Sequence, residues 1–78
     1  MTGMPNTEEG MKKLGRWLKE CRERTGMSCG TLAVKLGTTY ETIRLYEEGK
    51  RAMKIDRFLE ILTALDIPLD GFLSQTEW

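Results

Sequence analysis

The chain of 78 residues contains no histidine, and it has only two cysteines and two prolines. Cys21 and Cys29 lack CxxC spacing, and a zinc site needs about four Cys, His or carboxylate ligands. We therefore expect no metal site and, in a reducing cytosol, two ordinary thiols. The sequence also lacks a phosphate-cradling GxxxxGK loop, a nucleophile elbow and any histidine for acid–base chemistry. These absences predict a protein that is not an enzyme and binds no small-molecule cofactor.

Long hydrophobic runs are missing as well. No apolar stretch approaches the roughly 18 residues that a membrane span needs, and no secretory hydrophobic segment follows Met1. We therefore expect a cytoplasmic protein that does not enter a membrane. A hydrophobic content of 40% in 78 residues suits one small domain with a single core. The scarcity of proline and of β-branched runs favours an all-α fold.

Charge is balanced in number but not in position. The chain has twelve basic and twelve acidic residues, and its formal net charge is zero. All twelve bases lie within residues 12–57 together with six of the acids, which leaves that window a net charge of +6. The other six acids lie outside it, where there is no base. A segregated positive field favours a polyanionic partner, although a mixed, solvated surface would show the same asymmetry.

Helical spacing of apolar residues predicts a first helix from Glu8 to about Arg24. Residues 1–7 lack this spacing and are expected to form a disordered arm that ends in a capping hydroxyl at Thr7. Gly26 is expected to end the helix. The side chains expected to face the core follow spacings of three and four residues, with Trp17 beside them: Met11, Leu14, Leu18 and Cys21.

Residues 28–49 carry the most informative pattern in the chain. Two short amphipathic runs are joined at Gly37, where a tight turn needs a positive φ. Ala33, four residues earlier, allows two helix backbones to approach closely. This layout is that of a helix-turn-helix, which places its second helix in the major groove of DNA. The inward side chains of the two runs are expected to be Leu32, Ala33, Leu36, Ile43 and Tyr46.

The boundaries of the remaining helices follow from capping residues. Ser28 is expected to cap a helix from Cys29 to Leu36. Thr38 or Thr39 should cap the next, which ends at Gly49, and Thr38 with Glu41 would form a capping box. A fourth helix is expected over about residues 55–65, and Pro68 should start a fifth over residues 69–73, before a frayed tail at 75–78. Five residues of the fourth helix are expected to face inward: Ile55, Phe58, Leu59, Leu62 and Leu65.

The pattern from Leu14 to Leu73 resembles the Cro/C1-type helix-turn-helix family of phage repressors and bacterial transcriptional regulators. The matching segments are LGRWLKECRERTGMS, LAVKLGTTYETI, YEEGKR and FLEILTALDIPLDGFL. The resemblance implies a compact, all-α five-helix bundle of the phage-repressor type over residues 8–74, with double-stranded DNA as its partner. In this family the second helix usually begins with a Gln that anchors a phosphate, and a Pro follows the third helix. Cys29 and Met53 occupy those positions here.

The third helix is expected to carry the residues that contact bases. The N-terminal part of a recognition helix meets the base edges, which makes Tyr40, Glu41, Arg44 and Leu45 the candidates. Arg44 can bind a guanine through two hydrogen bonds, and Glu41 can accept one from a cytosine amine. A solvated helix face explains the same four residues, and the capping box alone would explain Glu41.

Four residues around the motif are candidates for phosphate contacts: Ser28, Thr39, Lys50 and Arg51. Lys50 and Arg51 follow the end of the third helix, where the helix dipole also favours positive charge, and the two explanations are compatible.

Two further roles are implied by the family resemblance. Arg22 and Glu47 are expected to form an ion pair that fastens the third helix to the first. Phe72, Leu73 and Trp78 are expected to contribute to a homodimer contact, although Phe72 would equally suit the core and Trp78 a frayed end.

The leading hypothesis is a sequence-specific regulator, a repressor that binds a palindromic operator as a homodimer. The alternative is an antitoxin or antirepressor whose third helix binds another protein. Cys29 and the acidic residues near the third helix favour that alternative.

Overall fold

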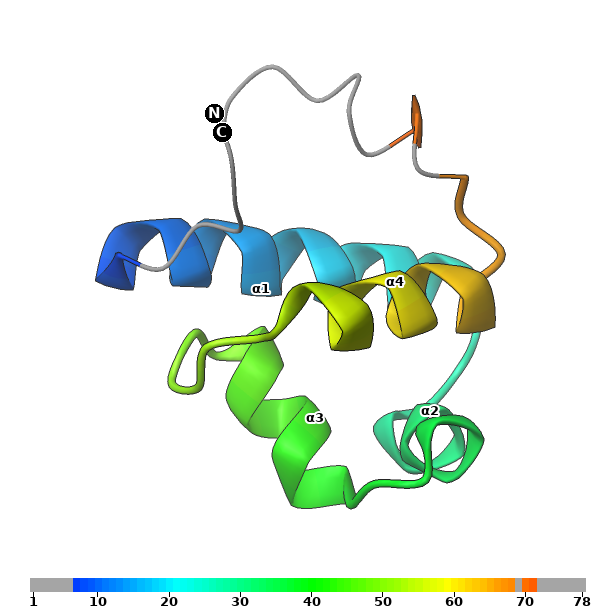
Figure 1. Cartoon of the computed structure of the whole chain (residues 1–78). Helices are drawn as coiled ribbons and strands as arrows, with labels where there is room; N and C mark the ends of the chain where they lie inside the picture. The colour runs from blue at the N-terminus through cyan, green and yellow to red at the C-terminus, as the bar shows by residue number, and fades with distance from the viewer. Residues whose placement is uncertain (1–6, 69, 72–78) are drawn as a thin grey trace.

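The computed structural model describes residues 7–68 and 70–71, and four α-helices form in that part of the chain (Figure 1). They are α1 (Glu8–Arg24), α2 (Cys29–Leu36), α3 (Tyr40–Glu47) and α4 (Ile55–Ala64). α3 packs against both α1 and α2, and α4 packs against α2. The predicted all-α fold is confirmed.

The predicted count of five helices is not supported. Of the expected helix at residues 69–73, only Asp70 and Gly71 are described, and both have helical backbone. Phe72 and Leu73 lie outside the described residues, as do residues 1–6 of the arm expected at residues 1–7 and the tail at residues 75–78. Within the described residues, four helices therefore position the helix-turn-helix.

Side-chain caps fix where the first three helices begin. The hydroxyl oxygen of Thr7 accepts from the Gly10 amide at 3.0 Å, and that of Ser28 accepts from the Thr31 amide at 3.1 Å. Thr39 caps α3 by accepting from the Thr42 amide at 3.2 Å. The predicted capping box between Thr38 and Glu41 is therefore wrong, because the helix begins one residue later than that box requires.

The turn between α2 and α3 depends on one glycine. Gly37 ends α2 in the left-handed region, with φ 68° and ψ 32°. Its amide donates to the carbonyl of Val34 at 3.2 Å, and the next amide, of Thr38, donates to that of Ala33 at 2.9 Å. A residue with a Cβ would be strained in this conformation. The glycine therefore closes α2 and redirects the chain into α3, as the sequence predicted.

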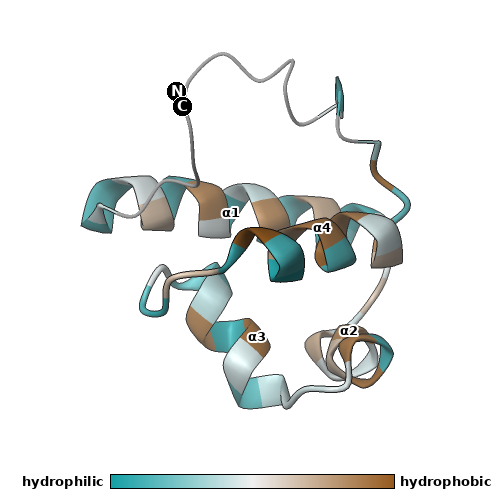
Figure 2. Ribbon diagram, viewed as in Figure 1, coloured by the Kyte–Doolittle hydropathy of each residue, from teal (hydrophilic) through white to brown (hydrophobic). Residues whose placement is uncertain are grey.

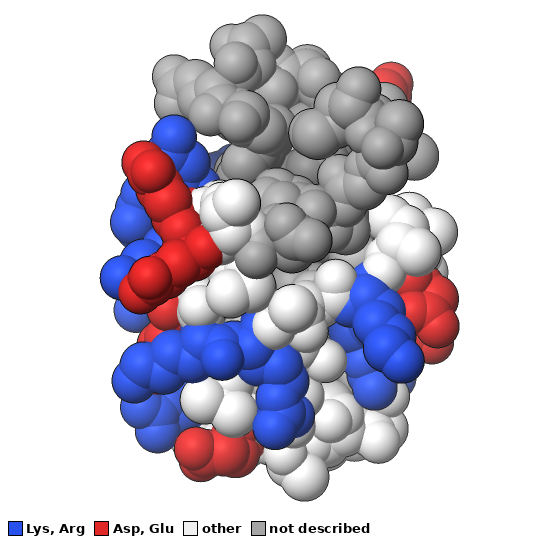
Figure 3. Space-filling model, turned by 60° about the vertical axis from the view of Figure 1, so that its left-hand side comes forward, with Lys and Arg blue, Asp and Glu red and all other residues white. Residues whose placement is uncertain are grey.

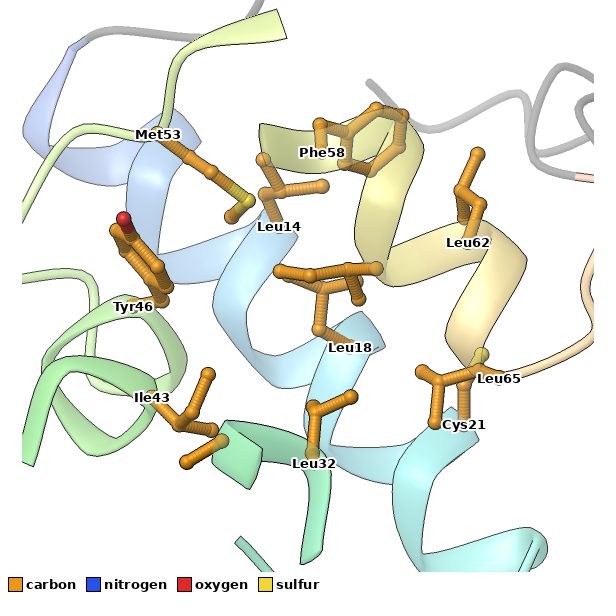
Figure 4. Packing of buried hydrophobic residues seen from close by; sticks show 12 residues of the cluster. Leu14, Leu18, Cys21, Leu32, Ile43, Tyr46, Met53, Phe58, Leu62 and Leu65 are labelled. Atoms are coloured by element: carbon orange, nitrogen blue, oxygen red, sulfur yellow. The ribbon is translucent and has the colours of Figure 1, made fainter. Parts of the chain in front are cut away.

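The core lies where the four helices meet, and their hydrophobic sides face one another there (Figure 2). Phe58, Ile43 and Ile61 are the largest fully buried side chains. Around them lie side chains from every helix and from the loop before α4 (Figure 4): Leu14, Leu18, Cys21, Leu32, Tyr46, Met53, Leu62 and Leu65. Met53 thus fills the core at the position where the resembling family carries proline.

The inward face of α4 differs from the prediction in three residues. Ile55 and Leu59 are 55% and 43% exposed, whereas Ile61, which was not predicted to face inward, is 2% exposed. Helical spacing fits two sets of residues equally well: 55, 58, 59 and 62, or 58, 61, 62 and 65. Only packing against the rest of the core selects the second set, and this tertiary information is missing from the periodicity.

α1 and α3 approach each other at two glycines. A Cβ added to Gly15 would lie 2.6 Å from the carbonyl oxygen of Tyr46 and 2.7 Å from the carbonyl carbon of Glu47. A Cβ on Gly49 would lie 2.8 Å from the Cα of Lys12. Such distances are far inside van der Waals contact, so a larger residue at either position would force its neighbours to shift.

Candidate nucleic-acid interface

The two faces of α3 have different environments. Ile43 and Tyr46 are 1% and 9% exposed and belong to the core. By contrast, Tyr40 is 54% exposed, Glu41 and Arg44 are exposed, and Leu45 is half-buried. The structure thus brings the four predicted base-reading residues to one helix and leaves three of them open to solvent. Such a face has the shape and the polar groups that a major groove accommodates.

Two neighbours hold the side chain of Arg44 in place: Tyr40 at the start of α3 and Glu48 at its C-terminal end. Nη2 of Arg44 donates to Oε2 of Glu48 at 2.9 Å, and its guanidinium carbon lies 5.9 Å from the centroid of the Tyr40 ring. The hydrogen bond to Glu48 raises the pKa of Arg44, and the same bond lowers the pKa of Glu48. Sequence reasoning did not assign Glu48 this contact, although its spacing of four residues from Arg44 is the signal for it.

A buried ion pair fastens α3 to α1. Nε of Arg22 lies 2.6 Å from Oε2 of Glu47, and its Nη2 lies 3.1 Å from Oε1. Nη1 of Arg22 donates to the carbonyl oxygen of Met27 at 2.8 Å, which ties the turn before α2 to the same pair. The two side chains are 10% and 7% exposed. The hydrogen bond to Glu47 raises the pKa of Arg22. This pair therefore fixes the position of α3 against α1.

Cys29 extends this cluster to the first residue of α2. Its Sγ donates to Oε1 of Glu47 at 3.7 Å, so the thiol faces the ion pair and is half-buried. Burial raises the pKa of the Cys29 thiol, and the negative charge of Glu47 raises it further.

The thiol of Cys29 should consequently react slowly at neutral pH. A raised pKa leaves less thiolate at pH 7 than a free thiol has, and the thiolate is the nucleophile. We expect iodoacetamide to modify Cys29 more slowly than glutathione at pH 7, with a rate that rises as the pH is increased toward the pKa. Peptide mass spectrometry gives the rate for each cysteine separately. Faster modification than glutathione at pH 7 would contradict the environment described for Cys29.

The predicted phosphate contacts lie at helix ends: Ser28 before α2, Thr39 before α3, and Lys50 and Arg51 after α3. The hydroxyls of Ser28 and Thr39 already act as helix caps. Lys50 lies 3.4 Å from Oε1 of Glu48, whereas exposed Arg51 has no carboxylate within 4.0 Å among the described residues. Figure 3 turns the left-hand side of Figure 1 forward, and in this view Lys and Arg side chains form several groups with acidic side chains beside them.

A hollow of about 310 Å³ lies beside α3, between that helix, α1 and the start of α2. We call it the α1–α3 hollow. It is lined by Arg16, Lys19, Arg22, Cys29, Tyr40, Arg44, Glu47 and Glu48. Sequence reasoning did not single out Arg16 and Lys19, although their separation of three residues places both on one face of α1.

Other kinds of site find no support in the part of the chain that is described. No group of three or more Cys, Asp or Glu side chains there could hold a metal ion. No helix among the same residues is long and apolar enough to cross a membrane. The predicted dimer residues Phe72, Leu73 and Trp78 lie outside the described residues.

Fold and exposed face together define a helix-turn-helix domain. The family model described as "Helix-turn-helix domain" matches residues 13–71. The chain therefore belongs to the helix-turn-helix domain family, and the predicted resemblance to its Cro/C1-type members is confirmed.

Individual relatives agree with this assignment. A Methanococcoides burtonii protein named "Putative HTH-type transcriptional regulatory protein" is 44% identical over 55 residues, which are 70% of this chain and 17% of that protein. An "Uncharacterized transcriptional regulator in ATPase CF(0) region" of Rhodospirillum rubrum is 30% identical over 64 residues, 82% of this chain and 59% of the relative. The chain thus spans less than two thirds of either relative.

A solved structure shows the same fold. The restriction-modification controller protein C.AhdI from Aeromonas hydrophila aligns with a TM-score of 0.77 and 31% sequence identity. The alignment covers 82% of this chain and 93% of that protein.

Proposed function

We propose that the chain is a cytoplasmic, sequence-specific regulator of transcription that binds double-stranded DNA through α3. It represses transcription as a homodimer on a palindromic operator. The observation that carries the proposal is the exposed face of α3, which presents Tyr40, Glu41 and Arg44 while Ile43 and Tyr46 hold the helix in the core. Two relatives of this chain are named as transcriptional regulators, which supports the same function.

In this proposal the residues divide by the part of DNA that each contacts. Tyr40, Glu41, Arg44 and Leu45 read base edges in the major groove. Phosphates are bound by four residues around them: Ser28, Thr39, Lys50 and Arg51. Pairing two copies through the C-terminal end, including Phe72, Leu73 and Trp78, would place two recognition helices one turn of DNA apart, as a palindromic site requires.

The proposal is tested by selection of bound sequences from a random duplex library. The expected result is a palindromic winner, since a two-fold symmetric dimer presents the same face of α3 to each half-site. Affinity for the winning duplex should fall with salt with a log–log slope of roughly −4 or steeper, corresponding to about five phosphate contacts. Absence of duplex binding at low salt would refute the proposed function.

Arg44→Ala should relax the preference for one base. We expect a loss of about 1–3 kcal/mol for the selected base at a single position of each half-site, and little change for the other three bases. Fluorescence anisotropy on duplexes that vary at each position measures this. Arg51→Ala serves as the control, because removing a phosphate-binding group should weaken all sequences alike. Uniform weakening by Arg44→Ala would instead make Arg44 a phosphate contact.

A protein-interaction role on the same fold is the second candidate, as in an antitoxin or antirepressor. One observation in its favour is the hydrogen bond from Arg44 to Glu48 at 2.9 Å, because it engages the guanidinium that would otherwise contact a base. The other is Cys29, which stands where the resembling family has the Gln that anchors a phosphate. In that case a protein partner would occupy the exposed face of α3, and the library would yield no duplex.

A further inference from the structure

Two exposed cations of α1, Arg16 and Lys19, line the α1–α3 hollow. The other two cations of the hollow are already paired. Arg22 lies 2.6 Å from Glu47, and Arg44 lies 2.9 Å from Glu48. Neither Arg16 nor Lys19 has a carboxylate within 4.0 Å among the described residues, so their donors are available to a ligand.

The charges of the hollow leave it positive. Four bases and two acids line it, which gives a net charge of +2, and both acids are turned toward the paired cations. Uncommitted guanidinium and ammonium groups side by side are typical of sites that bind phosphate. The ligand chemistry that the hollow fits is therefore that of a phosphate group.

The position of the hollow indicates which phosphate. An α-helix about 10–12 Å in diameter fills a major groove about 12 Å wide, so the DNA backbone must run along the sides of the inserted helix. Tyr40 and Arg44 belong both to the exposed face of α3 and to the wall of the hollow. A backbone strand that flanks α3 on this side would therefore meet Arg16 and Lys19.

We infer that Arg16 and Lys19 bind a phosphate of the DNA backbone, so that α1 forms one wall of the DNA interface. This inference rests on the proposed function and assigns it a phosphate-binding site outside the helix-turn-helix motif. The two side chains fix the register of α3 in the groove without reading sequence, since phosphate contacts position a protein and carry no base information.

The test compares wild-type protein with the Arg16→Ala/Lys19→Ala variant on the selected duplex over a series of salt concentrations. The expected result is about tenfold weaker binding at low salt and a log–log slope less steep by about 1 for each phosphate that the variant no longer neutralises. The ratio of affinities for selected and scrambled duplexes should not change. Arg24→Ala/Lys35→Ala removes the same charge outside the hollow and should leave the slope unchanged. Exchanging the two residues, Arg16→Lys/Lys19→Arg, should restore the wild-type slope.

Three outcomes would overturn the inference, and each is distinguishable. A wild-type slope in the Arg16→Ala/Lys19→Ala variant removes these residues from the interface while the proposed function stands. Titration with inorganic phosphate can be followed by NMR. Saturable shifts confined to Arg16 and Lys19, together with phosphate binding that duplex DNA does not displace, would assign the hollow to free phosphate. A wild-type protein that binds no duplex at low salt would refute the proposed function itself. Because both side chains are exposed, circular dichroism should show that the variant retains the wild-type fold.

Discussion

Arg22→Ala should lower the free energy of unfolding by about 3–5 kcal/mol, because it leaves the Glu47 carboxylate buried and unpaired. The carbonyl oxygen of Met27 loses its donor in the same change. A domain of this size has only a few kcal/mol of stability from its core, so much of the variant should be unfolded at room temperature. Urea denaturation followed by circular dichroism measures the effect.

Two further variants separate the buried pair from a general effect of charge. Lys35→Ala removes an exposed cation and should change stability by less than about 0.5 kcal/mol. Replacing both members, as in Arg22→Met/Glu47→Leu, removes the unpaired charge and should recover most of the loss. Equal effects of Arg22→Ala and Lys35→Ala would show that the pair contributes nothing to holding α3.

Gly15→Ala should also destabilise the protein, although alanine is the better helix former. The added methyl group would lie 2.6 Å from the carbonyl oxygen of Tyr46, so α1 and α3 would have to separate. Overpacking of this kind typically costs about 1–3 kcal/mol and occasionally more. The gain from alanine in a helix interior is about 1 kcal/mol. Because the clash is with backbone, we expect the cost to exceed that gain, with a net loss of about 2 kcal/mol in urea denaturation and weaker DNA binding.

Gly30→Ala is the matched control for this change. Gly30 is also helical, but the nearest atom to its added Cβ would be the Ser28 hydroxyl oxygen at 3.9 Å, an ordinary contact. The intrinsic preference for alanine should then dominate, and we expect a gain of about 0.5–1 kcal/mol. A gain from Gly15→Ala as well would mean that the two helices can move apart without loss.

Much of the fold could be predicted because it depends on local signals. The hydroxyls of Thr7 and Ser28 cap their helices at the predicted residues, and Gly37 has the predicted left-handed turn. The errors are those that local signals cannot prevent. Ile55 and Leu59 satisfy helical spacing as well as Ile61 does, and only the packing of α4 against its neighbours decides between them. Thr38 and Thr39 are both good caps, and the position of α3 selects the second.

The candidate site was predicted less completely, because a site joins residues that are distant in sequence. The exposed residues of α3 follow from periodicity on a single helix. The contribution of Arg16 and Lys19 depends on how α1 crosses α3, and that crossing is set by Gly15 and by the Arg22–Glu47 pair. The contact between Arg44 and Glu48 lies at helical spacing, yet whether the side chains meet depends on their rotamers.

The opposite faces of α3 also bear on how this protein can diverge. Anchoring depends on Ile43, Tyr46 and Glu47, whereas the outward positions 40, 41 and 44 take almost no part in the core. Mutation can exchange the outward set in small steps while the inward set keeps the helix in place. If α3 reads DNA as proposed, a lineage of such domains can acquire new target sequences without losing the fold, and α3 is the segment in which a designer would randomise residues first.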